Sequence, residues 1–440
     1  MGHGGTTAAR RGGLRAVCLG LPEVRGRERL SRGNRAAGTF DSAGSERAPG
    51  GPLQRPGRRD MNADQGFMIR ALQLARRGWY TTRPNPRVGC VLVRDGRIIG
   101  EGWHRRAGEP HAERLALAAV DGDPRGATAY VTLEPCCHFG RTPPCADALV
   151  EAGIGRVVVA MEDPNPLVAG RGLQRLREAG IRVEVGIQEQ AARALNPGFI
   201  RRCTLGQPLV RVKLAASLDG RTAMANGESQ WITSDSARRD VHRLRAAADA
   251  LVTGIGTVIA DDPSLNVRLT AADLGLDAEE KVPTPLRVIL DSRLRTPETA
   301  RLLRLPGRTL IVGTADPYGN RRRLEAAGAE VLIQNTATAD SRRALDLPAV
   351  MRDLAARGVN ELLVEAGPTL AGAFVQAGLV DELLVYLAPH VMGHRGRPLF
   401  HLPGVESMNE RIGLRIVEIR AVGQDWRVRA IPEVGQTGVG

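Results

Sequence analysis

Short apolar runs alternate with amphipathic stretches along most of the chain, and this alternation constrains the fold more than any other feature of the sequence. Apolar runs at residues 88–93 and 98–102 are joined through Asp95-Gly96, a dipeptide typical of tight β-hairpin turns. Strands and helices then alternate to about residue 185, and the pattern resumes from residue 209 to about residue 429. Such alternation is typical of a sheet covered by helices, so we expect an α/β fold in both halves.

The individual elements are expected where apolar residues recur at helical spacing, or where they alternate or run continuously as in strands. The expected helices are 64–77, 112–120, 146–152, 173–178, 235–247 and 369–377, and the expected strands besides the hairpin are 129–133, 156–160, 183–185, 209–216, 250–253, 286–290, 309–312, 361–364 and 382–387.

The length of the chain predicts two domains. Its 440 residues exceed the roughly 250–300 residues at which one hydrophobic core stops growing. The Leu-Gly-Gln-Pro stretch at 205–208 is a natural linker, so the expected domains are 61–207 and 208–432. Residues 1–60 are rich in Gly and Arg without an apolar period, which predicts a disordered extension, and residues 433–440 should form a flexible tail.

Charge and composition exclude some classes of partner. The formal net charge is +13, but aromatic residues make up only 3%, and no basic run contains the aromatic side chains on which single-stranded bases stack. More than half of the charge excess lies in residues 1–60, so we expect no nucleic-acid partner. No apolar run approaches the roughly 18 residues of a membrane span. The cysteines, without a secretory signal, favour reduced thiols and a cytoplasmic location.

A potential metal site stands out in the first half. His111, Cys136 and Cys145 supply one imidazole and two thiolates, and Glu113 adds a carboxylate that need not bind metal. Three protein ligands leave one tetrahedral position of a zinc ion open for water, as a catalytic site requires. Bound zinc lowers the pKa of that water to about 7, and Glu113 could carry protons from it to a leaving amine. These residues predict a hydrolytic deaminase with one zinc ion per chain, although Cys137 is an alternative ligand to Cys136.

The pattern resembles the H-x-E…P-C-x-x-C signature of zinc nucleobase deaminases, except that eight residues separate Cys136 from Cys145. The longer spacing within 132–145 is similar to the bifunctional deaminase–reductase of riboflavin synthesis, as are the segments 83–90 and 108–113. The resemblance implies a cytidine-deaminase-like α/β/α fold. It further implies substrate contacts by Asn85, His104, His138 and Arg141, with Arg141 binding the substrate phosphate.

The second half carries a weaker signal of its own. Gly254-Ile-Gly256 is a fragment of a dinucleotide-binding fingerprint, and the Gly-Pro turn at 367–368 precedes an expected helix, where free backbone N–H groups can bind pyrophosphate. Residues 213–223, 227–234, 261–265 and 365–372 are similar to the reductase domain of the same family. This similarity implies a dihydrofolate-reductase-like α/β fold with NADPH as the cofactor.

The resemblance also assigns site residues in the reductase. The implied substrate-binding residues are Ser229, Arg245, Leu265, Arg268 and Glu365. The implied NADPH-binding residues are Ala215, Trp231, Thr257, Asp261, Ser292, Gly367, Pro368, Thr369, Leu370, Ala371, Gly372 and Ala373.

Taken together, the resemblance covers roughly residues 61–429 and implies two consecutive reactions on small phosphorylated pyrimidines. The first is zinc-dependent hydrolytic deamination of 2,5-diamino-6-ribosylamino-4(3H)-pyrimidinone 5′-phosphate. The second is NADPH-dependent reduction of the ribosyl chain of 5-amino-6-(5-phosphoribosylamino)uracil to ribityl. Two alternatives remain open: a nucleotide or tRNA deaminase with a non-catalytic second domain, and a second half that only binds or oligomerises. A homodimer is expected by analogy with the family.

Overall fold

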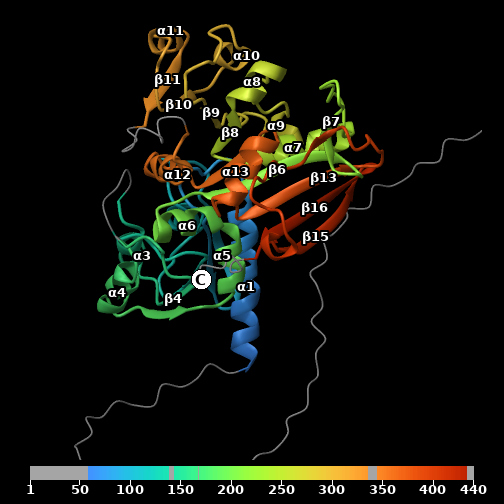
Figure 1. Cartoon of the computed structure of the whole chain (residues 1–440). Helices are drawn as coiled ribbons and strands as arrows, with labels where there is room; N and C mark the ends of the chain where they lie inside the picture. Colours follow the sequence, from blue (N-terminus) through green and yellow to red (C-terminus); the bar gives the residue numbers. More distant parts are fainter. Residues whose placement is uncertain (1–57, 138–142, 167, 335–343, 434–440) are drawn as a thin grey trace, which may run out of the picture. The chain divides into compact units, whose positions relative to one another are not determined.

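A computed structural model of the chain describes residues 58–137, 143–166, 168–334 and 344–433 (Figure 1). The chain divides into two compact units, Met1–Arg55 and Pro56–Gly440, and every described residue belongs to the second unit. The disorder expected for 1–60 therefore lies outside the described residues except at 58–60, and the expected flexible tail lies outside them except at Glu433. Within the described ranges, no helix is long and apolar enough to cross a membrane.

The described residues of the first half form a five-stranded sheet in the order β2-β1-β3-β4-β5. The pairs β1–β2 and β1–β3 are antiparallel, whereas β3–β4 and β4–β5 are parallel. The expected hairpin is confirmed: Asp95 and Gly96 both have positive φ, 52° and 73°, as its tight turn requires. The strands are β1 (Gly89–Arg94), β2 (Arg97–Trp103), β3 (Thr128–Val131), β4 (Arg156–Val159) and β5 (Arg182–Val185).

Helices cover both faces of this sheet because its strands alternate their side chains between two cores. Val91 of β1 packs in one core with α1, α5 and α6, whereas Cys90 and Leu92 pack in the other with α2, α3 and α4. The expected α/β/α arrangement is thus confirmed. The helices are α1 (Arg58–Arg77), α2 (Ala112–Ala118), α3 (Cys145–Glu151), α4 (Arg171–Glu178), α5 (Glu189–Leu195) and α6 (Pro197–Leu205).

The described residues of the second half form a nine-stranded sheet in the order β11-β10-β9-β8-β12-β6-β13-β16-β15. All neighbours from β11 to β13 are parallel, and β16 and β15 are added antiparallel. The strands are β6 (Leu209–Ser217), β8 (Ala250–Gly254), β9 (Leu286–Leu290), β10 (Thr309–Gly313), β11 (Ala329–Ile333), β12 (Glu361–Glu365), β13 (Glu382–Ala388), β15 (Leu414–Val422) and β16 (Asp425–Pro432); β7 (Arg221–Ala223) and β14 (Arg397–Pro398) pair separately.

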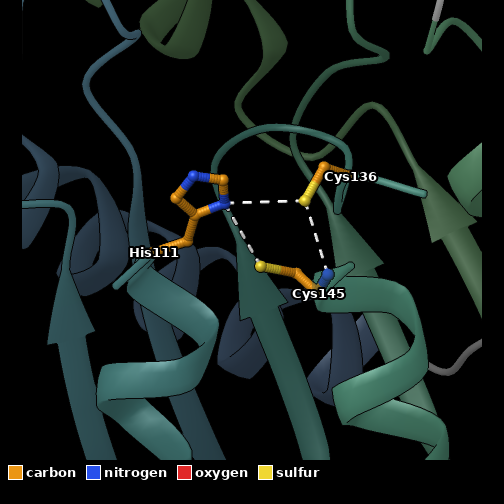
Figure 2. Close-up of side chains that lie close together, drawn as sticks. All are labelled: His111, Cys136 and Cys145. Atoms are coloured by element: carbon orange, nitrogen blue, oxygen red, sulfur yellow. Dashed lines mark hydrogen bonds between the residues drawn. The ribbon is translucent and has the colours of Figure 1, made fainter. Parts of the chain in front are cut away.

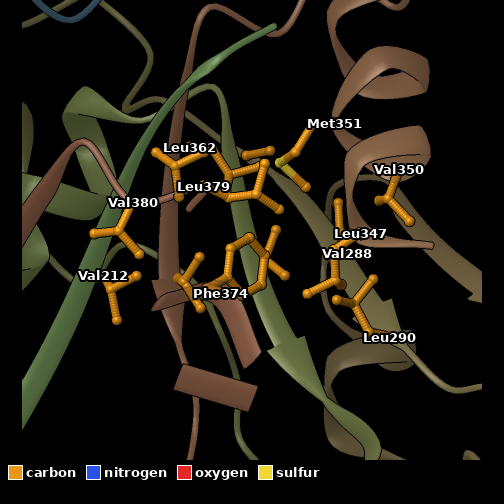
Figure 3. Packing of buried hydrophobic residues seen from close by; sticks show 14 of the residues in the cluster. Val212, Val288, Leu290, Leu347, Val350, Met351, Leu362, Phe374, Leu379 and Val380 are labelled. Carbon is orange, nitrogen blue, oxygen red and sulfur yellow. The ribbon is translucent and has the colours of Figure 1, made fainter. Parts of the chain in front are cut away.

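Two apolar cores also flank this second sheet. Figure 3 shows the first, in which Val212 and Val288 of the sheet pack against Met351 and Phe374 of two helices. The second core packs Leu251 and other residues of the opposite face against α8 and α11. The helices are α7 (Asp235–Ala247), α8 (Ile255–Asp261), α9 (Ala271–Leu274), α10 (Arg301–Arg304), α11 (Arg321–Ala326), α12 (Leu347–Ala356) and α13 (Pro368–Gln376), followed by the 3₁₀ helix η2 (Met408–Glu410).

Several elements differ from the expectation. Helix α1 begins at Arg58, earlier than the expected residue 64, because the apolar period marks only the part of a helix that packs on a core. Helices α5, α6 and α12 and the hairpin β15–β16 are not expected from the sequence. In β15 every residue is exposed or half-buried, so its apolar residues do not give the inward and outward alternation of a covered strand.

Buried charges join the two sheets. Glu361, the first residue of β12, is 3% exposed and accepts hydrogen bonds from Arg87 Nη1 at 2.9 Å and from Arg211 Nη1 at 2.5 Å. Burial alone would raise the pKa of Glu361, but Arg211 and Arg87 lower it to about 2. Removing one partner from a buried ion pair leaves an uncompensated charge and is strongly destabilising.

We predict that Glu361→Gln lowers the free energy of unfolding by about 3 kcal/mol at pH 7, measured by urea denaturation of the full chain. The pKa of the Glu361 carboxylate is about 2 in the folded chain, below the ordinary value of about 4.3. The carboxylate therefore stabilises the fold fully when the pH is above about 4.3, and this stabilisation is lost as the pH falls from there toward 2. The difference between wild type and variant should therefore shrink over this range.

Glu330→Gln is the matched control, because Glu330 also pairs with two arginines, Arg308 and Arg357, but its side chain is 43% exposed. Its effect should stay below about 1 kcal/mol. Equal effects of the two substitutions, or a Glu361 difference independent of pH, would show that the buried pairing does not stabilise the fold.

Candidate active sites

The three candidate zinc ligands come from three ends of secondary structure. His111 is the residue before α2, Cys136 lies in the segment after β3, and Cys145 is the first residue of α3. The backbone N–H of Ala146 donates to the Cys136 carbonyl at 3.1 Å, which ties the Cys136 segment to the start of α3. Figure 2 shows the three side chains pointing toward one another.

The distances between these ligands fit a tetrahedral zinc ion. His111 Nδ1 lies 3.5 Å from Cys136 Sγ and 3.3 Å from Cys145 Sγ, and all three ligand atoms lie within 4.8 Å of one another. Zinc bonds of about 2.1 Å to nitrogen and 2.3 Å to sulfur would separate such atoms by about 3.6 Å at the tetrahedral angle. The set is therefore close enough to share one ion. Cys137 is not a member of this cluster.

The electrostatics of the cluster favour a thiolate at Cys136. The contact with the Cys145 thiol, together with His111 and the backbone N–H of Cys145, lowers the pKa of Cys136 to about 4, although burial opposes this shift. The same contact and burial raise the pKa of Cys145, so Cys136 is the more acidic thiol of the pair. Binding of a metal ion would require both cysteines to be deprotonated.

Glu113 lies in the first turn of α2, two residues after His111, and is 3% exposed. Burial is the main cause that raises its pKa to about 7, and the neighbouring Cys136 acts in the same direction. Glu113, His111 and Cys136 all line one cavity of about 480 Å³. This volume falls within the range of roughly 300–1,000 Å³ that small-molecule sites occupy.

Two residues implied by the family resemblance, Asn85 and His104, line the same cavity. The buried His104 ring contacts the carbonyl of Pro110 through Nδ1 at 3.2 Å and the Asn85 Nδ2 group through Nε2 at 3.1 Å. A neutral ring with its proton on Nδ1 satisfies both contacts, and burial lowers the pKa of His104. His104 also packs edge-on against His111, with 5.2 Å between ring centroids. His138 and Arg141 lie outside the described residues.

Other lining residues are not among those expected from the sequence. Glu134 is buried and accepts backbone hydrogen bonds from Asp163, Gly170, Gly172 and Leu173, so it shapes the loop after β4. The Asp-Pro-Asn-Pro run at 163–166 could have indicated this, since ligand sites in α/β proteins gather beyond the carboxyl ends of strands. Further lining residues that the sequence analysis does not identify include Asp163, Asn165, Phe199, Arg202 and Gly358.

In the second half, the structure brings two of the implied substrate-binding residues into contact. Glu365, at the end of β12, forms two hydrogen bonds with Arg245 of α7, at 2.5 and 3.0 Å. Lys213 Nζ lies 3.9 Å from the same carboxylate. Burial alone would raise the pKa of Glu365, but Arg245 and Lys213 lower it to about 2. His242, not expected from the sequence, adjoins this group, and burial and Arg245 lower its pKa to about 4.

Several implied cofactor-binding residues lie at one edge of the nine-stranded sheet. Strands β9, β8, β12 and β6 are parallel neighbours, so their carboxyl ends share an edge. Ser292 follows β9, Thr257 lies in the first turn of α8 directly after β8, and Gly367 follows β12. Gly367 is the N-cap residue of α13 and, as a glycine, has no side chain that could cap the helix. Residues 368–373 form the start of that helix. Ala215 lies within β6.

The other implied reductase residues are more dispersed. Arg268 donates its backbone N–H to His242 at 3.3 Å, and the buried Leu265 has a φ of 40°. Trp231 is 67% exposed beneath the Arg238 guanidinium. Asp261 is the last residue of α8, at the opposite end from the β8 edge, and Ser229 is half-buried. Among the described residues, no hydrogen bond or ion pair joins Ser229, Trp231 or Asp261 to the Glu365 group.

Comparison with protein families divides the chain in the same way as the two sheets. Residues 61–161 match the cytidine and deoxycytidylate deaminase zinc-binding region. Residues 208–428 match the RibD C-terminal domain.

Curated relatives match over most of their own length. The chain is 50% identical over 365 residues to the riboflavin biosynthesis protein RibD of Escherichia coli, covering 82% of this chain and 97% of the relative. It is 42% identical over 378 residues to the RibD protein of Bacillus amyloliquefaciens, covering 85% of this chain and 98% of the relative.

Solved structures match equally broadly. RibD of Acinetobacter baumannii is 46% identical with a TM-score of 0.77, and the match covers 85% of this chain and 100% of that structure. A diaminohydroxyphosphoribosylaminopyrimidine deaminase/5-amino-6-(5-phosphoribosylamino)uracil reductase of Thermotoga maritima is 32% identical with a TM-score of 0.73 over 85% of this chain and 100% of that structure. These matches over most of the chain show that it belongs to the RibD family of bifunctional riboflavin biosynthesis proteins, in agreement with its two sheets and its His-Cys-Cys cluster.

Proposed function

We propose that the chain catalyses two consecutive steps of riboflavin biosynthesis. The first domain hydrolyses the amine of 2,5-diamino-6-ribosylamino-4(3H)-pyrimidinone 5′-phosphate, and the second reduces the ribosyl chain of the resulting 5-amino-6-(5-phosphoribosylamino)uracil to ribityl. The observation that carries the proposal is the cluster of His111, Cys136 and Cys145 beside the buried Glu113 in one cavity. The match of residues 208–428 to the RibD C-terminal domain favours a reductase over a non-catalytic second domain.

In the deaminase, we propose His111, Cys136 and Cys145 as the zinc ligands and Glu113 as the proton carrier. Zinc, when bound, lowers the pKa of a water molecule to about 7. Glu113 takes a proton from the attacking water and gives it to the leaving amine, so that a C–O bond forms, the C–N bond breaks and ammonia departs. Burial of Glu113 suits it to both roles, because its pKa lies near neutrality. Asn85, His104, His138 and Arg141 are proposed to orient the substrate.

In the reductase, we propose that Glu365 and Arg245 hold the phosphorylated sugar, together with Ser229, Leu265 and Arg268. NADPH supplies the hydride for the ribose C1′ carbon. The edge formed by the ends of β9, β8 and β12 supports cofactor binding at Thr257, Ser292 and 367–373, since ligands of α/β sheets bind beyond the carboxyl ends of strands. Ala215, Trp231 and Asp261 complete the proposed cofactor set.

We further propose domain limits of 61–207 and 208–432, a cytoplasmic location and a homodimer. The limits are supported by the break between α6 and β6 and by the two family matches. The described cysteines form no disulfide, which agrees with a reducing compartment.

Cys136→Ser and Cys145→Ser should each remove most of the zinc from the purified full chain, because two remaining ligands bind a metal ion far more weakly than three. Zinc per chain is measured by atomic emission. Cys137→Ser is the matched control and should retain one zinc ion per chain. Loss of zinc in the Cys137 variant with retention in the Cys136 variant would reverse the assignment of the ligand.

Glu113→Gln should lower kcat for ammonia release by about 10²- to 10⁴-fold, the contribution typical of general acid–base catalysis. Zinc content, and NADPH oxidation with the uracil substrate, should stay unchanged. Glu109→Gln is the control, since Glu109 lines the same cavity but its side chain is 47% exposed. It should alter the rate by no more than about threefold, because exposed charges interact weakly. Full activity of the Glu113 variant would rule out the proton transfer proposed here.

Glu365→Gln should reduce the reductase kcat/KM for the uracil substrate by about 10- to 100-fold, since charge-assisted hydrogen bonds to a substrate contribute about this much. Binding of NADPH, followed by fluorescence titration, and ammonia release should stay at wild-type levels. Glu330→Gln, an exposed acidic residue of the same domain, should change none of these. A Glu365 variant with weakened NADPH binding and normal substrate KM would place this residue in the cofactor site instead.

A further inference from the structure

We propose that the second domain contributes to the deaminase pocket: Asn360 positions Arg202, and Arg202 adds to the Arg141 implied by the family resemblance in binding the phosphate of the deaminase substrate. This inference rests on the proposed function of the first domain. The cavity that contains His111 and Glu113 is also lined by Arg202 of α6 and by Gly358, which lies after α12 in the second half of the chain.

Asn360 bridges two walls of this cavity. Its side chain is 4% exposed, and its Oδ1 accepts a hydrogen bond from Arg202 Nε at 2.6 Å. Its Nδ2 donates to the carbonyl of Pro84 at 2.8 Å, and both Pro84 and Arg202 line the cavity. One buried amide of the second domain therefore holds both the loop that carries Asn85 and the helix that carries Arg202.

The backbone around Asn360 is itself fixed. The carboxylate of Asp249 accepts the backbone N–H groups of Asn360 and Glu361 at 2.9 and 2.7 Å. Gly358 has a φ of 88°, and a Cβ atom there would lie 3.5 Å from the Pro84 ring. This left-handed conformation suits glycine and strains other residues. The segment thus meets the Pro84 loop in a single defined geometry.

The charges that line the cavity favour Arg202 as an anion-binding group. Glu109, Glu113, Glu134 and Asp163 line the cavity with acidic side chains, whereas Arg202 is the only arginine among the lining residues that the structure describes. An anionic substrate needs a fixed cation in such surroundings.

The guanidinium of Arg202 is suitably placed for this role. Nε is occupied by Asn360, and the two Nη groups form no hydrogen bond within the described ranges, so they present a planar pair of donors that matches a phosphate. The guanidinium carbon also lies 5.6 Å from the centre of the Phe199 ring. Arg202 therefore has both a fixed orientation and free donors.

The position of Arg202 relative to the zinc ligands agrees with this assignment. Helix α2, which follows His111, packs on one face of the five-stranded sheet, and α6 packs on the other. Arg202 and His111 therefore line the cavity from elements on opposite faces of the sheet. We infer that the pyrimidine lies at the zinc ligands and the phosphate at Arg202.

The experiment compares ammonia release by the zinc-loaded full chain from the phosphorylated diaminopyrimidine and from its dephosphorylated counterpart. Arg202→Ala should raise KM for the phosphorylated substrate by about 10- to 100-fold, the loss typical of charge-assisted hydrogen bonds, with kcat changed by less than about threefold. The KM for the dephosphorylated substrate should not change. Arg202→Lys should restore part of the loss, because an ammonium retains the charge without the planar donor pair.

Asn360 is tested as a positioning residue. Asn360→Ala should reproduce the KM increase of Arg202→Ala, whereas Asn360→Asp, which keeps an acceptor for Arg202, should show a smaller increase. Zinc content and the reductase kcat/KM serve as internal tests of folding and should equal those of wild type. Arg193→Ala is the matched control, since Arg193 lies in the neighbouring α5, is 51% exposed and pairs with Glu189.

Wild-type KM values in both Arg202 variants would overturn the inference, as would an equal KM increase for the phosphorylated and dephosphorylated substrates. Loss of phosphate discrimination in Arg141→Ala together with unchanged discrimination in Arg202→Ala would assign the phosphate to Arg141 alone and would also overturn it. A wild-type chain that releases no ammonia from either substrate would instead refute the proposed function.

Discussion

The buried carboxylate of Glu361, held between Arg87 and Arg211, is the interaction on which the arrangement of both sheets depends. Arg87 belongs to the segment that enters the first sheet, and Arg211 lies in β6 of the second. Glu361 itself begins β12, which lies between β8 and β6 in the parallel part of the sheet. The same five-residue strand ends at Glu365, so its two ends serve the junction and the candidate reductase site.

Several arginines in the described part of the chain have structural roles. Arg287, 1% exposed, donates to the carbonyls of Leu305, Pro306 and Gly307 and fixes the turn before β10. Arg156 binds Asp64 and Glu184, which joins α1 to the parallel edge of the first sheet. A planar guanidinium with five donors can satisfy several acceptors at once.

Much of this organisation could be predicted from the sequence because it is local. The hairpin at Asp95-Gly96 and the positions of His111, Cys136 and Cys145 next to expected strands and helices follow from short-range patterns. Arg202 and Asn360 could not be identified in this way, because neither has a distinctive neighbouring sequence and their hydrogen bond spans 158 positions. Strand β15 was missed for a different reason: its exposed apolar residues do not show the alternation of a strand that covers a core.

The placement of Gly358 in the wall of the deaminase cavity bears on how a two-domain enzyme of this kind could evolve. Gene fission at the linker would remove residues 358–360 from the polypeptide that carries the zinc ligands, and the separated deaminase would need a new wall or a persistent complex with its former partner. Fusion, conversely, keeps the second domain at a high effective concentration next to the deaminase. Contact between the two halves of this chain thus shapes one pocket, in addition to linking two consecutive reactions.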